Sequence, residues 1–167
     1  HMSCKLRPFT TVLAFVTLLP MTVFAQTASI AFGGLRADTS LPVEATADQL
    51  SVNQSDGTAI FSGNVVIIQG EMRLSAAEVR IEYAEGNTGK IERLHASGGV
   101  ILANGEDAAE SAEAVYTIAS GEVILTGNVL LAQSGGTLAG EKLIVDLNTG
   151  TGRMDGRVRT VLQPTGN

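Results

Sequence analysis

The chain has 167 residues, a formal net charge of −6 and an aromatic content of only 4%. A length of this order suits one domain with its own core. The acidic balance disfavours nucleic acid as a ligand, because a protein that binds the phosphate backbone needs an excess of Lys and Arg. With Cys4 as the single cysteine, packing rather than intrachain disulfides must hold the fold together.

Residues 1–25 have the features of a two-residue cloning remnant followed by a secretory signal peptide. A cationic start precedes an apolar run at 12–19 and small or apolar residues up to Ala25. We expect export and cleavage near Ala25, and the alternative is that the segment is retained as a membrane anchor. Residues 26–44 are mostly small and polar, so they are expected to form a flexible lead-in.

Four copies of a short glycine-containing phrase organise the rest of the chain. The phrase is Phe61-Ser-Gly-Asn-Val65, and it returns at Ala96–Val100, Leu125–Val129 and Met154–Val158. The four valines are 35, 29 and 29 residues apart, which predicts a stacked repeat architecture. Because glycine tolerates a bend or a positive φ, each copy is expected to carry the chain between the two walls of one groove.

Apolar and polar residues alternate on either side of these bends, which is the period of a β-strand with one buried face. Each repeat is expected to hold three or four strands, giving an all-β fold with about 14–16 short strands. The domain is expected to span 45–162 and to leave 163–167 as a tail. The one competing signal is Glu106–Ala119, whose Ala and Glu content also suits a helix.

One face of the predicted strands collects aliphatic and aromatic residues that could line an apolar groove for acyl chains. Burying methylene groups stabilises a complex by about 0.8 kcal/mol each. Ordinary core is the alternative interpretation of each of these side chains. The candidate groove residues are Leu50, Val52, Phe61, Val65, Ile67, Leu74, Val79, Ile81, Tyr83, Leu94, Val100, Leu102, Tyr116, Ile118, Leu125, Val129, Leu131, Leu143, Val145, Leu147, Met154 and Val158.

The sequence offers little for catalysis or for metal binding. His95 is the only histidine beyond the leader, and no cysteine accompanies it. Asp48 and Glu141 occupy one aligned position of the repeat, where the other two copies have alanine. A carbohydrate-active β-helix enzyme stays open as an alternative only if two carboxylates converge in space. No metal or cofactor is expected.

Five phrases together resemble the OstA-like family of periplasmic lipopolysaccharide-transport proteins. They are Ala47–Val52, Phe61–Gly70, Leu74–Tyr83, Gly121–Val129 and Gly140–Leu147. The resemblance extends from about Pro42 to Val161. It implies an open, twisted β-jellyroll of antiparallel strands, whose apolar interior accepts the acyl chains of lipid A. It also implies a periplasmic location and no enzymatic activity.

The same resemblance implies partners at the two ends of the domain. An LptC-like partner anchored in the inner membrane is expected at the N-terminal end, and an LptD-like outer-membrane assembly protein at the C-terminal end. The resemblance also implies that the domain can associate with itself end to end, and open sheet edges offer unpaired backbone groups for such contacts. Two alternatives remain: an LptC-like anchored protein of the same fold, and a structural repeat module without lipid cargo.

Overall fold

The computed structural model describes residues 30–31, 35–86 and 89–164, so the proposed signal peptide lies outside the described residues. No helix long and apolar enough to cross a membrane occurs in the described ranges. The all-β prediction is confirmed. The strands are β1 (Ile30–Ala31), β2 (Glu44–Thr46), β3 (Gln49–Asn53), β4 (Thr58–Gln69), β5 (Met72–Tyr83), β6 (Ile91–Asn104), β7 (Asp107–Thr117), β8 (Glu122–Gln133), β9 (Gly136–Asp146), β10 (Thr151–Asp155) and β11 (Arg159–Leu162).

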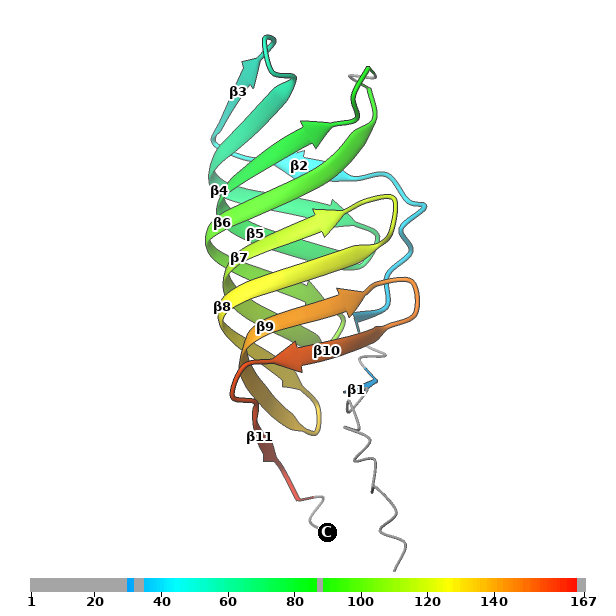
Figure 1. Cartoon of the computed structure of the whole chain (residues 1–167), viewed down its shortest axis with the longest axis vertical. Helices are drawn as coiled ribbons and strands as arrows, with labels where there is room; N and C mark the ends of the chain where they lie inside the picture. The colour runs from blue at the N-terminus through cyan, green and yellow to red at the C-terminus, as the bar shows by residue number, and fades with distance from the viewer. Residues whose placement is uncertain (1–29, 32–34, 87–88, 165–167) are drawn as a thin grey trace, which may run out of the picture.

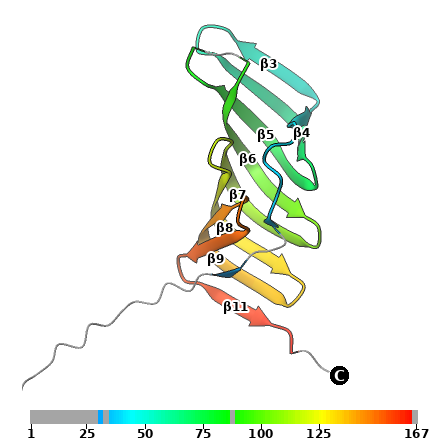
Figure 2. The ribbon, with the colours of Figure 1, turned by 90° about the vertical axis from the view of Figure 1, so that its right-hand side faces the viewer.

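The strands form one antiparallel sheet, in which β4 to β10 follow each other in chain order. The short strand β2 completes the edge beside β4, where β3 also pairs, while β1 pairs with β10 and β11 with β9. Figure 1 shows the strands stacked along the long axis, from β3 and β4 at one end to β10 and β11 at the other. The sheet curls on itself. In the side view of Figure 2, the strands run obliquely to the long axis of the stack.

The recurring glycine phrase lies inside long strands and not between short ones. In β4, Gly63 and Asn64 both have positive φ, +79° and +47°, and the pairing with β5 shifts by one residue between Ser62 and Val65. The same shift occurs at Gly98-Gly99 of β6 and at Gly127-Asn128 of β8. These are β-bulges, which bend a strand and increase its twist while the strand continues on the other side.

The predicted number of 14–16 strands is therefore wrong, because a bulge does not end a strand. The described residues form eleven strands, and the six from β4 to β9 are each 11 to 14 residues long. At each edge of the sheet, two short strands take the place of one long strand. β2 and β3 pair with the two halves of β4, and β10 and β11 pair with the two halves of β9.

Each bulge glycine lies against a residue at one aligned position of the repeat. A Cβ on Gly98 would be only 2.6 Å from the Cβ of Ala77, closer than Cβ atoms ever pack. Position 98 thus requires glycine for two reasons: the backbone has a positive φ, and the facing strand leaves no room for a Cβ atom. The four contacts pair Gly63 with Asp48, Gly98 with Ala77, Gly127 with Ala112 and Gly156 with Glu141.

The segment with helical composition, Glu106–Ala119, is a strand in the structure. Its residues 107–117 form β7, which pairs with β6 on one side and β8 on the other. Tertiary pairing overrides the high intrinsic helix propensity of alanine and glutamate here. The alternating burial of β7 places Ala109, Ala114 and Tyr116 in the core.

The bulge geometry predicts unequal effects of alanine at two neighbouring glycines. Gly98 and Gly99 both have positive φ, but a Cβ on Gly99 would have no atom within 4 Å. Gly99→Ala should therefore lose about 1–2 kcal/mol of unfolding free energy through backbone strain. Gly98→Ala should lose at least about 1 kcal/mol more, because the new methyl group overlaps Ala77. Urea denaturation measures both losses.

A second substitution tests whether the overlap is the cause. Ala77→Gly removes the methyl group that faces Gly98. In this background, Gly98→Ala should cost about as much unfolding free energy as Gly99→Ala does in the wild-type chain, because the overlap is gone. Equal losses for the two single glycine variants would contradict the proposed close contact.

Candidate functional site: the apolar interior and its seam

The bulges let both halves of every long strand face one interior. On β8 the buried residues stay at odd positions through the bulge, with Leu125 before it and Val129 after it. On the facing strand β9 the buried positions change from even to odd, from Leu138 to Leu143. Glu141, the residue opposite the bulge, lies where this change occurs. With an uninterrupted two-residue period, the apolar residues of one half of β9 would have faced the solvent.

The structure brings most of the predicted groove residues into this interior. Partly buried against the core are Phe61, Tyr83 and Ile118. Leu50, Val52 and Val158 are exposed, with 53%, 62% and 47% of their surface accessible. The other sixteen are buried: Val65, Ile67, Leu74, Val79, Ile81, Leu94, Val100, Leu102, Tyr116, Leu125, Val129, Leu131, Leu143, Val145, Leu147 and Met154.

The three exposed candidates lie at the two ends of the stack. Leu50 lies on the edge strand β3 and pairs with Phe61 of β4. Every residue of β3 is exposed. Val158 lies between β10 and β11 at the opposite end, where Leu162 is 72% exposed. Apolar side chains of the interior thus continue to both open ends of the sheet.

Sequence reasoning missed several residues of the same interior. Met72 and Val123 are buried two positions from Leu74 and Leu125, so strict use of the strand period would have found them. Leu35, which is 0% exposed, had no such signal, because it lies in the segment expected to be a flexible lead-in. In the structure, residues 35–43 of that segment pack along the domain instead.

Residues 35–41 cross the seam where the curled sheet approaches itself, and we call this segment the seam strap. Leu35, Ala37 and Thr39 alternate with the exposed Arg36, Asp38 and Ser40. On one rim of the seam, the amide of Ala37 donates to the carbonyl of Leu147 at 2.9 Å. The hydroxyl of Thr39 donates to Oδ1 of Asn148 at 2.8 Å on the same rim.

On the other rim, side-chain amides hold the backbone of the strap. Nε2 of Gln69, the last residue of β4, donates to the carbonyls of Thr39 and Leu41 at 3.1 and 2.9 Å. Nδ2 of Asn104, the last residue of β6, donates to the carbonyl of Arg36 at 2.7 Å. In the sequence both residues look only like parts of Gln-Gly and Asn-Gly turns.

The Gln69 amide is itself fixed by a buried tyrosine. Oη of Tyr116 donates to Oε1 of Gln69 at 2.6 Å, and both side chains are 1% exposed. Burial raises the pKa of Tyr116, because the ionised phenolate would lose its hydration. The neutral hydroxyl, Gln69 and the strap therefore form one hydrogen-bonded chain from the interior to the seam.

A hollow of about 600 Å³ lies beside the end of the strap. Val43, Ile91 and Ile118 line it, and all three also pack against the core. Charged side chains of Glu85, Lys90 and Glu92 complete its wall. The hollow is a place on the seam where apolar side chains can be reached from solvent.

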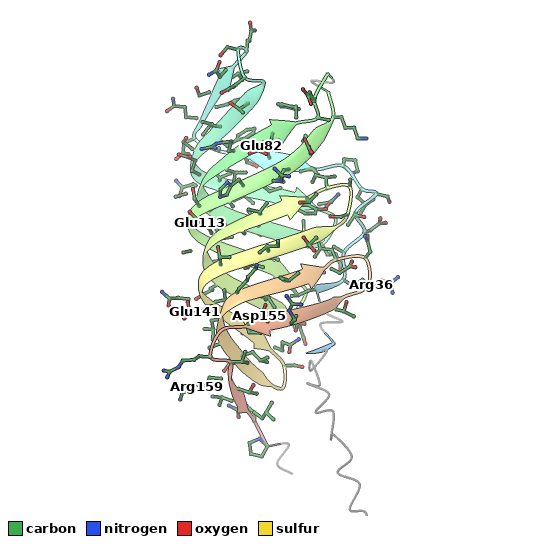
Figure 3. All side chains as sticks on the ribbon, in the orientation of Figure 1. Arg36, Glu82, Glu113, Glu141, Asp155 and Arg159 are labelled. Atoms are coloured by element: carbon green, nitrogen blue, oxygen red, sulfur yellow. The ribbon has the colours of Figure 1, made fainter. Side chains whose placement is uncertain are left out.

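The described basic residues on the strands do not point into the interior. Arg73 and Arg80 are exposed on the outer face of β5, between buried positions. Arg93 pairs with Glu82 at 2.9 Å, and Arg153 pairs with Asp155 at 3.2 Å. Figure 3 shows labelled charged side chains such as Glu113 and Glu141 at the margin of the stack.

The carboxylate pair that an enzyme would need does not form from Asp48 and Glu141. Five strands of the sheet, β4 to β8, separate the β2–β3 level from β9. At about 4.8 Å per strand the two positions are roughly 25–30 Å apart along the stack. Paired glycosidase carboxylates lie about 5–10 Å apart. Within the described residues, no group of three or more potential metal ligands occurs.

Comparison with known proteins identifies the family of this domain. A family model described as "LptA/(LptD N-terminal domain) LPS transport protein" matches residues 44–151. The chain belongs to this family. The match to the LptA/LptD N-terminal domain begins at the first residue of β2 and ends at the first residue of β10, so the strap and β11 lie outside it.

Several relatives are similar over much of the chain. A protein of Rhizobium meliloti is 27% identical over 158 residues, covering 89% of this chain and 85% of its own length. The lipopolysaccharide export system protein LptA of Escherichia coli K12 is 30% identical over 122 residues, 70% of this chain and 65% of that protein. LptH of Pseudomonas aeruginosa, also named a lipopolysaccharide export system protein, is 26% identical over 90% of this chain and 96% of its own.

The fold agrees with a solved member. The crystal structure of LptH from Pseudomonas aeruginosa, described as the LptA-homologous periplasmic component of the lipopolysaccharide transport device, superposes with a TM-score of 0.68. It covers 77% of this chain and 99% of that one at 20% identity. The open β-jellyroll implied by the sequence is therefore the observed fold.

The buried Tyr116–Gln69 pair predicts a measurable and pH-dependent contribution to stability. Tyr116→Phe leaves Oε1 of Gln69 without its donor and should lower the unfolding free energy by about 1–2 kcal/mol at pH 7. Because the pKa of Tyr116 is raised in the folded protein, its contribution is complete below pH about 10 and declines above it. Alkaline loss of stability should thus be smaller in Tyr116→Phe.

Tyr83→Phe serves as the matched control, because it removes the same hydroxyl from a tyrosine that is only partly buried. Urea denaturation at pH 7 and at several values above pH 10 gives the comparison. Identical pH profiles for wild type and Tyr116→Phe would show that Tyr116 does not carry the alkaline dependence.

Proposed function

We propose that this protein is a periplasmic lipopolysaccharide carrier that bridges the inner and outer membranes and shields lipid A acyl chains in its apolar interior. The observation that carries the proposal is the composition of the inner face. Among the described residues, the buried polar or charged side chains are Gln69, Asn104, Asp107 and Ser111, and none is a Lys or Arg. The rest of the buried interior is hydrophobic, and it suits alkyl chains and not a phosphate group.

The names of the relatives support the cargo. The proteins of Escherichia coli and Pseudomonas aeruginosa are named as lipopolysaccharide export system proteins, and the solved LptH is described as a periplasmic component. A dozen buried methylene groups would contribute on the order of 10 kcal/mol, enough to hold one acyl chain out of water. We expect no catalytic turnover in this protein, since a carrier needs only to bind and release.

The ends of the stack suit transfer between proteins. The edge strands β3 and β11 are exposed along their whole length, so their free backbone groups can pair with another chain. Glu44, Asp48 and Asp56 lie exposed at the β3 end, while Arg157 and Arg159 lie exposed at the β11 end. Opposite charges favour head-to-tail contact of like domains, which would join their interiors.

This polarity fits an LptC-like inner-membrane partner at the N-terminal end and an LptD-like outer-membrane partner at the C-terminal end. Self-association would use the same two edges. In each contact the apolar residues Leu50 and Val52, or Val158 and Leu162, would be covered by the neighbouring domain.

Photo-crosslinking tests the cargo site directly. A photoreactive phenylalanine placed at Phe61, Tyr83 or Ile118 lies on the inner face with little disturbance, because these positions are only partly buried. We expect lipopolysaccharide adducts from these three positions, detected with an antibody against lipid A. Ile101 and Leu130 are apolar but exposed on the outer face, 44% and 39%, and serve as matched controls. Equal adduct yields at inner and outer positions would contradict the proposed function.

A further inference from the structure

The seam strap covers the seam of the curled sheet, which is where an acyl chain would enter the interior. We propose that residues 35–41 are a displaceable strap that competes with acyl chains: it closes the seam when the interior is empty and leaves it when lipid enters. This inference rests on the proposed lipid-carrier function. It adds a conformational step to that function and assigns the step to named contacts.

The strap is placed to close the interior because it joins both rims of the seam. Gln69 and Asn104 end two strands on one rim, and Leu147 and Asn148 follow β9 on the other. Figure 1 shows the described residues before β2, 35–43, running along one side of the stack, past the ends of the hairpins. Arg36 points away from the stack at that side in Figure 3, so only its backbone faces Asn104.

The strap also occupies apolar space that a lipid would use. Leu35 is 0% exposed and belongs to the same core cluster as Leu102 and Leu143. Ala37 of the strap and Val43, just after it, also pack against this cluster. An acyl chain that entered along the seam would meet these side chains first, so the two cannot both be accommodated in the same packed volume.

The attachment of the strap is suited to exchange. Its polar contacts to the rims are isolated hydrogen bonds and not a strand ladder, since residues 35–43 belong to no strand. The donors on one rim are the neutral side-chain amides of Gln69 and Asn104, which can donate to any carbonyl oxygen. An acylated sugar carries ester or amide carbonyls at the head of each chain, so Gln69 and Asn104 would keep a partner after the strap leaves.

The hollow beside Val43 gives a starting point for this exchange. Its apolar wall contains Ile91 and Ile118, which already contact the core. A chain tip that enters there would lie beside Val43, two residues beyond the strap, and could displace the strap progressively from Leu41 toward Leu35. The order of release is therefore expected to run from the β2 end of the segment toward its N-terminal end.

A disulfide across the seam tests the inference. The Thr39 hydroxyl is 2.8 Å from Oδ1 of Asn148, an atom one bond beyond the γ position, so Thr39→Cys with Asn148→Cys brings two thiols near each other across the seam. The full chain would carry Cys4→Ser to leave no other thiol. We expect the oxidised double variant to bind lipopolysaccharide at least tenfold more weakly than its reduced form, with both single variants binding like wild type under the same oxidant.

The outcomes separate this inference from the proposed function. Equal binding by oxidised and reduced double variants would overturn the strap while leaving the carrier function intact. Loss of binding in every variant and in wild type would overturn the carrier function and the strap with it. If the disulfide does not form, hydrogen exchange on the wild-type chain decides the matter. Exchange at the Ala37 amide, bonded to Leu147, should rise when lipopolysaccharide is added, and unchanged or slower exchange would refute displacement.

Discussion

The domain can close around an interior because the bulge glycines of β4, β6 and β8, and Gly156 between β10 and β11, lie in close contact with the residues facing them. The contact between Gly98 and Ala77 is the clearest case, because a methyl group on Gly98 would overlap the Cβ of Ala77. The left-handed conformation of the glycine and its neighbour bends each of these strands without ending the sheet. Repeated at four levels of the stack, this bend turns a flat meander into a curled sheet with one shared inner face.

The remaining features follow from that curl. Both halves of each strand contribute aliphatic residues to the interior, so the inner face is long, apolar and open at its two ends. A curled sheet that does not close on itself leaves a seam, and here a backbone segment held by Gln69 and Asn104 covers it. An interior sealed by a non-covalent strap can be both stable when empty and open to cargo, which is what a carrier requires.

Much of this architecture could be predicted from the sequence, because it repeats. The period of the glycine phrase, the alternation around Leu125 and Leu143, and the family resemblance indicated the fold class and most inward residues. The strand lengths could not be predicted, because a glycine followed by asparagine suits a turn and a bulge equally well. Nor could the strap be predicted, since Leu35 has no large apolar partner at strand spacing within a polar segment, and the strap's hydrogen-bond partners Gln69 and Asn104 lie 28 to 68 positions along the chain.

Methyl NMR gives the most direct test of the central claim that cargo lies on the inner face. Aliphatic methyl groups occur on both faces of the same strands: Leu125 and Leu143 point inward, whereas Ile124 and Ile144 lie at the alternate positions. On titration with lipopolysaccharide, we expect shift changes and contacts with acyl methylene protons at Leu125 and Leu143, with Ile124 and Ile144 little affected. Acyl contacts at Ile124 and Ile144, with the inward methyl groups unchanged, would contradict the account.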